Sequence, residues 1–447
     1  MARFIPEYAM AAVPRYTSYP PATQFHDGVG EAVYCDWLGA LASSDTLSLY
    51  VHMPFCRTLC WYCGCHTMVA NRAEQVDRYL DTLKTEIDRV AFHVSSGVPV
   101  VHLHFGGGTP NLLTPEQFSG LIQHIQNRFR FVADAEIAVE ADPRNLGEPH
   151  AEAFAACGVT RVSLGVQDIS PDVQRLINRV QPLAVIEHAV ARLRDAGIGA
   201  INMDLMYGLP GQSVDHVVRS ARAMLALEPD RFAVFGYAHV PWFKKHQRAI
   251  DESRLPGGAE RLAQAEAVAE TLAGAGYAAI GLDHFAMPDD PLAVAQAAGR
   301  LRRNFQGYTI DPATALIGLG ASSIGSLFQG FVQNEPHLGR YKAAVAAGRL
   351  PIVRGLALDD EDRLRSTVIE MLMCNLEVDV GAVCGASDTG IMTGAWSRLS
   401  ELHDDGLVEI DGSRVRMTAD GRPYVRNVAA CFDTFHRDVP SRHSRAI

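Results

Sequence analysis

The segment Cys56-Arg57-Thr58-Leu59-Cys60-Trp61-Tyr62-Cys63-Gly64-Cys65 is the most informative part of this sequence. It directly follows an apolar run at residues 47–52, which predicts a β-strand, so the cysteines stand on a loop after the end of that strand. Four of the nine cysteines fall within these ten residues and the others are scattered. This grouping predicts a metal site in a reducing cytoplasm, and not a disulfide framework.

The spacing C-x3-C-x2-C supplies three thiolates, from Cys56, Cys60 and Cys63. Thiolates are soft ligands that suit zinc or iron–sulfur clusters. Three thiolates on a [4Fe–4S] cluster leave one iron open, and S-adenosylmethionine can chelate that iron through its amino and carboxylate groups. Electron transfer into the sulfonium then splits a C–S bond and gives a 5′-deoxyadenosyl radical. The spacing therefore predicts a radical enzyme.

Two plainer readings of the cysteine loop are a structural zinc site and buried free thiols. Zinc sites usually draw paired ligands from two separate places, and no second C-x2-C or H-x3-H pair is present. Buried thiols do not explain four cysteines in ten residues. Cys65 is ambiguous: as a fourth ligand it would close the open iron, so we expect a role near the site or in packing.

Six short apolar runs alternate with amphipathic helical stretches between residues 46 and 285. The runs are at residues 47–52, 101–105, 136–140, 162–167, 201–206 and 232–237. A repeated βα pattern predicts an α/β fold with a parallel sheet. The periodicity does not separate a partial (β/α) barrel from an open doubly wound sheet. In either fold, functional residues gather after the carboxyl ends of the strands.

The two ends of the chain have a different character from the middle. Residues 1–45 carry several prolines and little periodicity, and they predict an extended arm before a barrel at 46–290. Residues 291–447 predict a smaller, mostly helical domain, with a helix at 363–376 and a β-hairpin formed by 406–410 and 415–418. This winged-helix-like pattern raises DNA binding, regulation or partner binding as alternatives. Acidic residues before the hairpin, at 401, 404 and 405, weaken the DNA-binding alternative.

Composition narrows the class of protein further. The 447 residues carry a net charge of −11, which argues against a nucleic-acid partner, because phosphate backbones require clustered Lys and Arg. Nowhere do 18 uninterrupted apolar residues occur, so we expect no membrane span. The first residues lack the pattern of a secretory signal, and we expect a cytoplasmic protein.

Several polar or glycine-rich positions follow the predicted strands. Gly106-Gly107-Gly108-Thr109-Pro110 comes after the second strand, where consecutive glycines let the backbone approach a ligand closely. Glu140, Gln167 and Asp204 end later strands and predict one polar rim. In most proteins an arginine in the position of Arg179 would be a solvated surface charge. A ligand that carries a carboxylate could instead bind its guanidinium in a bidentate manner, and Arg179 would then point into the protein.

Taken together, these residues resemble the radical S-adenosylmethionine superfamily, and within it the family of oxygen-independent coproporphyrinogen III oxidases. The resemblance covers nearly the whole chain. It rests on Arg15-Tyr16-Thr17-Ser18-Tyr19-Pro20-Pro21, Tyr50-Val51-His52-Met53-Pro54-Phe55-Cys56, Cys63-Gly64-Cys65, Gly236-Tyr237-Ala238-His239, Asp283-His284-Phe285-Ala286, Arg303-Asn304-Phe305-Gln306-Gly307-Tyr308 and Cys431-Phe432-Asp433.

The resemblance implies a partial (β/α)6 barrel, one [4Fe–4S] cluster held by Cys56, Cys60 and Cys63, and two molecules of S-adenosylmethionine. The first molecule is expected to contact Tyr50, Gly107, Glu140 and Ile324. The second is expected to contact Tyr62, Gly108, Thr109, Gln167, Arg179, Asp204 and Ala238. Cys65 is expected near the active site.

The implied reaction converts coproporphyrinogen III to protoporphyrinogen IX by oxidative decarboxylation of two propionates to vinyl groups. The alternative is a heme chaperone or heme-degrading relative on the same scaffold. Chaperone-type relatives usually lack a cysteine at position 65 and the proline-bearing arm, and this chain has both. We expect a monomer that uses an electron donor and an electron acceptor, which the sequence does not identify.

Overall fold

A computed structural model describes residues 2–385, 392–436 and 444–446. Its main feature is a curved sheet in the order β16-β15-β14-β13-β1-β4-β5-β6-β7-β8-β10-β9. The seven central strands, from β13 to β8 in that order, are parallel to their neighbours. They are β1 (Leu47–Met53), β4 (Pro99–Gly107), β5 (Arg130–Ala141), β6 (Arg161–Gln167), β7 (Ala200–Tyr207), β8 (Arg231–Gly236) and β13 (Ala315–Leu319).

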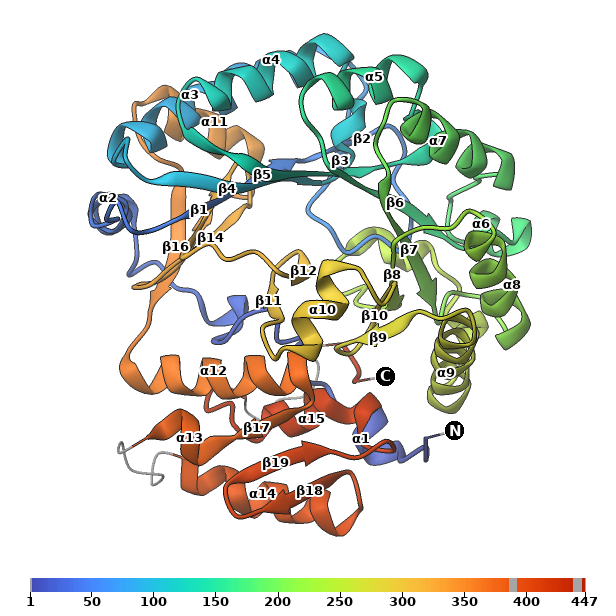
Figure 1. The fold of residues 1–447 in the computed structure, drawn as a ribbon. Helices are drawn as coiled ribbons and strands as arrows, with labels where there is room; N and C mark the ends of the chain where they lie inside the picture. Colours follow the sequence, from blue (N-terminus) through green and yellow to red (C-terminus); the bar gives the residue numbers. More distant parts are fainter. Residues whose placement is uncertain (1, 386–391, 437–443, 447) are drawn as a thin grey trace.

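Helices cover the convex face of this sheet, and the concave face looks toward the C-terminal part of the chain (Figure 1). The covering helices each connect one parallel strand to the next, as the βα pattern predicts. They are α3 (Ala73–His93), α4 (Pro115–Gln126), α5 (Glu148–Ala156), α6 (Pro171–Leu176), α7 (Leu183–Asp195) and α8 (Val214–Leu225). The curved sheet with helices outside agrees with a partial barrel.

The main core lies between the sheet and these helices. Alternate residues of the strands are buried there, and α3 contributes buried side chains at helical spacing, among them Leu80, Leu83 and Ile87. Because the strands are parallel, their carboxyl ends share one edge of the sheet. That edge carries the loops after β1, β4, β5, β6 and β7.

The sheet extends beyond residue 290, where the alternation of strands and helices ends. Antiparallel strands widen it at both margins. They are β9 (Ala278–Ile280), β10 (His284–Ala286), β14 (Ile324–Leu327), β15 (Gly330–Asn334) and β16 (Ile352–Ala357), with α9 (Gly258–Gly274), α10 (Pro291–Ala297) and α11 (Leu338–Ala346) nearby in the chain. Two small ribbons complete this part: β2 (Phe55–Cys56) with β3 (Met68–Val69), and β11 (Arg302–Asn304) with β12 (Gly307–Thr309).

A second core joins the two ends of the chain (Figure 1). It is built by α12 (Asp360–Asn375), β17 (Glu377–Asp379), α13 (Val380–Cys384), α14 (Thr393–Asp404), β18 (Val408–Asp411), β19 (Arg414–Met417) and α15 (Val425–Ala430). Ile5, Val13 and Tyr16 of the N-terminal arm are buried in this same core. Between its extended stretches the arm contains α1 (Pro6–Met10) and α2 (Glu31–Gly39).

The C-terminal hairpin is confirmed. β18 and β19 pair antiparallel, and Gly412 lies between them with φ of 59°, a value that favours glycine. The predicted helix at 363–376 is confirmed as α12, which begins at Asp360 behind an Asp359 capping box. In the described part of the chain, no helix has the length and apolar character needed to cross a membrane.

Candidate functional site

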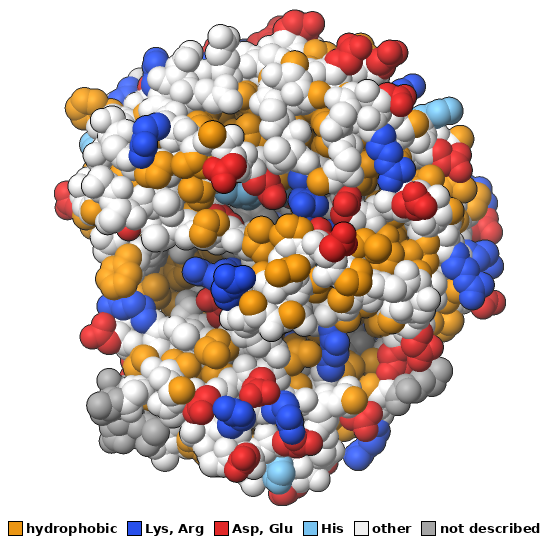
Figure 2. Space-filling model, in the orientation of Figure 1, with side chains coloured by type: hydrophobic (Ala, Val, Ile, Leu, Met, Phe, Trp, Pro, Cys, Tyr) orange, Lys and Arg blue, Asp and Glu red, His pale blue; other side chains and the backbone are white. Residues whose placement is uncertain are grey.

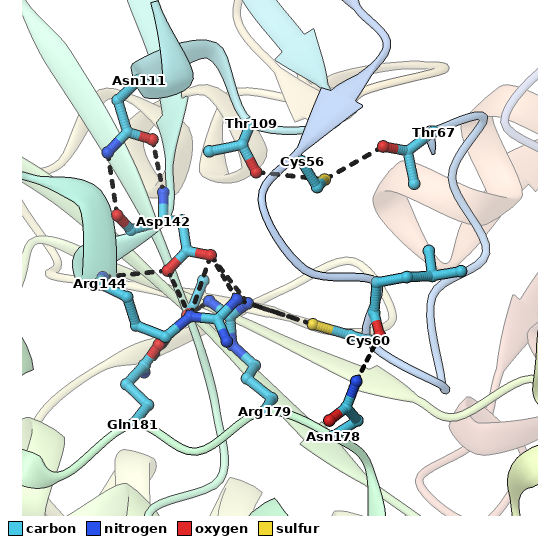
Figure 3. A network of polar contacts seen from close by, with 12 residues as sticks. Cys56, Cys60, Thr67, Thr109, Asn111, Asp142, Arg144, Asn178, Arg179 and Gln181 are labelled. Carbon is cyan, nitrogen blue, oxygen red and sulfur yellow. Dashed lines mark hydrogen bonds and ion pairs between the residues drawn. The ribbon is translucent and has the colours of Figure 1, made fainter. Parts of the chain in front are cut away.

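The cysteine loop leaves the sheet after β1 and lies at the carboxyl edge of the strands (Figure 3). Cys56 lies between two threonines: its Sγ is 3.3 Å from Thr109 Oγ1, which donates to it, and 3.1 Å from Thr67 Oγ1. Buried Cys60 accepts hydrogen bonds from two arginines, Arg179 at 3.5 Å and Arg144 at 3.9 Å. Both sulfurs are therefore surrounded by groups that stabilise a thiolate.

Contacts from distant segments hold the backbone of this loop. Asn178 donates to the carbonyl of Leu59 at 2.9 Å, and the Trp61 N–H donates to the carbonyl of Ile177 at 2.9 Å. After the third cysteine, Lys244 Nζ donates to the carbonyl of Cys65 at 2.9 Å. These contacts satisfy polar backbone groups that a short loop cannot satisfy by itself, and they fix where the cysteines point.

Cys63 and Cys65 interact directly, and their two thiols differ in acidity. A hydrogen bond from Cys65 lowers the pKa of Cys63 to about 7. The same hydrogen bond, together with the nearby Cys63 charge, raises the pKa of Cys65 well above its usual value. The two thiols are therefore close enough to share one proton.

A structural zinc site was the plainer interpretation of the cysteine loop. Among the residues that the structure describes, no three His, Cys, Asp or Glu side chains are grouped so that they could hold one metal ion. A structural zinc site uses four such ligands in a tetrahedron.

Three glycines after β4 form a cradle beside the cysteine loop. A Cβ at Gly106 would lie 2.7 Å from Glu140 Oε1, and one at Gly108 would lie 2.6 Å from the Phe55 carbonyl oxygen. Gly107 has φ of 106°, and a Cβ there would overlap the His52 ring. Only glycine allows the backbone to pass so close to the loop and to present its N–H groups there.

Glu140 is held as a carboxylate at the end of β5. It accepts a hydrogen bond from the Gly107 N–H at 3.1 Å, and its Oε1 is 3.2 Å from His104 Nε2. Burial raises the pKa of Glu140, but the His104 hydrogen bond and the Gly107 N–H outweigh it and leave the pKa below its usual value. The group is therefore an anion ready to accept further hydrogen bonds.

Asp204 has the opposite environment. Burial and the charge of Glu140 raise its pKa to about 7, although Asn202 and Ser163 donate hydrogen bonds to it at 2.8 and 3.2 Å. On the neighbouring strand, Gln167 pairs with Leu205, the residue after Asp204, and has φ of 69°, a left-handed value that non-glycine residues seldom adopt. A strained backbone of this kind at the carboxyl edge of the sheet is typical of a binding site.

Arg179 lies inside the protein, as a ligand-binding role requires (Figure 3). Its guanidinium donates to the carbonyl of Gly165 at 2.5 Å and lies 3.3 Å from Asp142 Oδ2. Asp142 also forms an ion pair with Arg144 at 2.6 Å. Burial lowers the pKa of Arg179, but nearby negative charge outweighs it, and Arg179 stays charged. Its buried Nε has no hydrogen-bond partner in the described part of the chain.

A cavity of about 1060 Å³ opens beside the cysteine loop, and the face in Figure 2 is hollowed with Lys and Arg side chains at the opening. Twelve of the fourteen predicted site residues line it: Cys56, Cys60, Cys63, Tyr62, Gly107, Gly108, Thr109, Glu140, Gln167, Arg179, Asp204 and Ala238. Cys65 also lines it. The cavity is large enough for a cofactor and a substrate together.

Tyr50 and Ile324, the other two predicted site residues, are not among the residues that line this cavity. Tyr50 stacks on the His104 ring, with centroids 5.9 Å apart. It pairs in register with Gly318, where a Cβ would lie 2.6 Å from the Ile324 carbonyl oxygen. The fold therefore brings these two residues close to each other, beside the residues of β4.

The sequence patterns missed several residues of this site. Asp142 forms ion pairs with Arg179 and Arg144, and Arg144 donates to Cys60. Both residues lie within four positions after Glu140 in the chain. Their position after a predicted strand was the available signal. His104 was also missed, and its alternation with His102 along a buried strand could have indicated it. No sequence signal indicated Lys244, whose contact with the loop depends on folding.

Comparison with known proteins gives matches over the whole chain. The family model of the Radical SAM superfamily matches residues 50–224, and the HemN C-terminal domain matches residues 358–424. Proteins named oxygen-independent coproporphyrinogen III oxidase are similar to this chain. One from Bradyrhizobium diazoefficiens is 48% identical and covers 98% of each chain, and one from Paracoccus denitrificans is 43% identical over 98% of this chain and 97% of its own.

A solved structure is also similar along nearly the whole length. Coproporphyrinogen III oxidase from Escherichia coli, described as a radical SAM enzyme, superposes with a TM-score of 0.90 at 39% identity. The match covers 94% of this chain and 98% of the other. The arm, the sheet and the C-terminal core thus have counterparts in a single known protein.

Proposed function

The chain belongs to the oxygen-independent coproporphyrinogen III oxidases of the radical S-adenosylmethionine superfamily, and on that premise we propose how the residues of its cavity divide the work. The reaction of the family is the oxygen-independent oxidation of coproporphyrinogen III to protoporphyrinogen IX. Two propionate side chains each lose a hydrogen atom, one electron and CO2, and each leaves a vinyl group. The observation that carries the proposal is the single cavity shared by the cysteine loop and the polar rim.

Cys56, Cys60 and Cys63 hold the [4Fe–4S] cluster in this proposal. The donor set fits, because three soft thiols meet one cavity and Thr67, Thr109, Arg144 and Arg179 stabilise negative charge on two of them. When bound, the cluster and S-adenosylmethionine supply the electron and the 5′-deoxyadenosyl radical that removes hydrogen from a propionate β-carbon. Cys65 lines the same cavity but is not a ligand in this proposal, because a fourth thiolate would close the iron that S-adenosylmethionine must reach.

The first S-adenosylmethionine is assigned to Tyr50, Gly107, Glu140 and Ile324. Glu140 is an anion beside the glycine cradle, and it can accept hydrogen bonds from the ammonium group of an amino acid. The open backbone at Gly107 lets the ligand lie close to the chain. Tyr50 and Ile324 do not line the cavity, and their assignment rests on the family; Tyr50 stacks on His104, the side chain whose Nε2 is 3.2 Å from Glu140.

The second S-adenosylmethionine is assigned to the residues along the other strand ends. These are Tyr62, Gly108, Thr109, Gln167, Arg179, Asp204 and Ala238. Arg179 offers an unpartnered Nε to a carboxylate, and Asp204, with its raised pKa, can share a proton with a hydroxyl or amino group. In this assignment Arg179 binds the carboxylate of the second S-adenosylmethionine, and Asp204 binds its ribose.

Other features fit this assignment and weaken the alternative. A heme chaperone or heme-degrading function is not favoured. Relatives named oxygen-independent coproporphyrinogen III oxidase match nearly the full length of the chain at 40–48% identity. We propose that the chain acts as a monomer in the cytoplasm, where its nine unpaired cysteines stay reduced. An external electron donor and acceptor complete the reaction, since each decarboxylation releases one electron from the substrate.

Binding stoichiometry tests the division into two cofactor sites. Reconstituted protein, equilibrated anaerobically with labelled S-adenosylmethionine in the absence of reductant, is expected to bind two molecules per chain. Glu140→Gln should weaken one of the two, because it removes the anion beside the glycine cradle. The surface variant Arg219→Gln on α8 serves as the control and should bind two. A wild-type value of one molecule per chain would contradict the second site.

A further inference from the structure

Four arginines from separate parts of the chain line the cavity in addition to the site residues assigned above. They are Arg15 of the arm, Arg261 of α9, Arg303 of β11 and Arg426 of α15. None of the four has a role in the assignment of the cluster or of the two S-adenosylmethionine molecules. Several of their buried nitrogens have no hydrogen-bond partner among the described residues: Arg261 Nε, Arg303 Nε and Arg303 Nη1.

Arg15 and Arg261 converge at the end of β8. Arg15 Nη2 donates to the carbonyl of Gly236 at 3.2 Å. A Cβ at Gly236 would lie 3.2 Å from Arg261 Nη2, so both guanidinium groups reach the same backbone position. Arg261 lies over the ring of Tyr207, 5.6 Å from its centroid, and this aromatic face orients the cation.

Arg303 faces the cavity from β11. Its guanidinium lies over the Tyr308 ring, 4.4 Å from the centroid, and its Nη1 is 4.0 Å from Asp283 Oδ1. That oxygen is also 2.7 Å from His284 Nδ1, so Asp283 is shared between two partners. The ion pair is long, and the guanidinium keeps donor capacity for another carboxylate.

Arg426 supplies charge without free donors. It donates to the carbonyls of Pro14 at 2.9 Å and Arg445 at 3.0 Å, and so it fastens the arm to the C-terminal end of the chain. Burial, followed by the charge of Arg15, lowers the pKa of Arg426 to about 9. The charge of Asp283 acts on both Arg15 and Arg303, and Glu266, Glu270 and Asp420 also line the cavity. Buried guanidinium groups that keep free donors are costly unless an anion binds them.

We propose that Arg15, Arg261 and Arg303 form a carboxylate-binding cluster that holds propionate groups of the tetrapyrrole while another propionate reacts beside the cysteine loop. The inference rests on the proposed function, since coproporphyrinogen III is the substrate that carries four propionates. A propionate at the reacting position occupies the rim near the cysteines. The remaining carboxylates need cations elsewhere in the same cavity, and arginine presents the planar donor fork that matches them.

Binding of a stable analogue tests the cluster separately from catalysis. The probe is coproporphyrin III, the oxidised form of the substrate, compared with its tetramethyl ester by quenching of porphyrin fluorescence on the reconstituted protein. Arg261→Gln and Arg303→Gln are each expected to weaken binding of the tetra-acid about ten- to hundredfold. Neither variant should change the affinity for the ester. Arg219→Gln, at an exposed position of α8, is the matched control and should bind both as wild type does.

The outcomes separate this inference from the proposed function. Reductant-driven cleavage of S-adenosylmethionine without substrate should be unchanged in both variants, which shows that the fold and cluster are intact. If one variant fails to fold, the other carries the test, and Arg261→Lys should recover part of the affinity. Tetra-acid binding as tight as wild type in a folded variant overturns the cluster while the function stands. A wild-type protein that neither binds nor converts the porphyrinogen overturns the proposed function itself.

Discussion

Replacing Cys56, Cys60 or Cys63 by serine is expected to remove most of the iron, the brown absorbance and all cleavage of S-adenosylmethionine. Each replacement takes one soft thiolate from a cluster that has only three, and a serine hydroxyl is a poor ligand for iron–sulfur clusters. Hydrogen bonds from Thr109 to Cys56 and from Arg179 to Cys60 stabilise negative charge on both sulfurs, although burial raises the pKa of Cys56. Iron and sulfide analysis, with electron paramagnetic resonance after reduction, measures the loss.

Cys65→Ser is the matched control, because it lies two residues from Cys63 in the same loop. This variant should keep its cluster, since Cys65 donates to Cys63 and a serine hydroxyl can also donate. Turnover in the variant is expected to fall, because residue 65 faces the cavity and tunes a ligand. Loss of the cluster from Cys65→Ser with retention in any one of the other three variants would refute the ligand assignment.

Arg179→Ala should keep the cluster, weaken binding of the second S-adenosylmethionine and reduce decarboxylation. The buried ligand carboxylate would lose a charged partner, which costs about 2 to 5 kcal/mol. Arg144 still contacts Cys60 and Asp142 in the variant, so the loop keeps one of its cations. Equilibrium binding of labelled S-adenosylmethionine, together with the rate of CO2 release, gives both effects.

Arg175→Ala supplies the control for this prediction from the same segment of chain. Arg175 is 63% exposed and pairs with Asp172, which is 79% exposed, so the pair contributes little. We expect wild-type binding and turnover from Arg175→Ala. Arg179→Lys keeps a charge but not the planar fork, and it should recover only part of the activity. Unchanged stoichiometry and turnover in Arg179→Ala would remove Arg179 from the second site.

The repeated βα pattern was predictable because strand and helix periodicities differ and each buried face must be apolar. The six predicted runs correspond to β1 and β4 through β8. The margin of the sheet was not predictable in the same way. The strands from β13 to β16 are short and mostly antiparallel, and among them only β15 and β16 are separated by a helix, α11, so the regular alternation disappears. We propose that the C-terminal domain begins near residue 358, after β16.

At the site, the contacts that could not be predicted are those between residues far apart in the sequence. Glu140, Gln167 and Asp204 could be placed on one rim because parallel strands share their carboxyl edge. By contrast, the contact of Lys244 with Cys65 joins residues 179 positions apart, and the burial of Ile5 against α15 joins the two ends of the chain. Such contacts leave no periodic signal. The unpaired donors of Arg261 and Arg303 became apparent only in the folded cavity.

Turnover of a deuterated substrate shows whether this protein carries out the proposed decarboxylation. Reconstituted protein is incubated anaerobically with a reductant, S-adenosylmethionine and coproporphyrinogen III that carries deuterium at the propionate β-carbons. We expect two CO2 released per protoporphyrinogen IX, with a tricarboxylic intermediate, and one deuterium atom in each 5′-deoxyadenosine, all measured by mass spectrometry. Cleavage of S-adenosylmethionine with no CO2 released and no deuterium in 5′-deoxyadenosine would contradict this expectation.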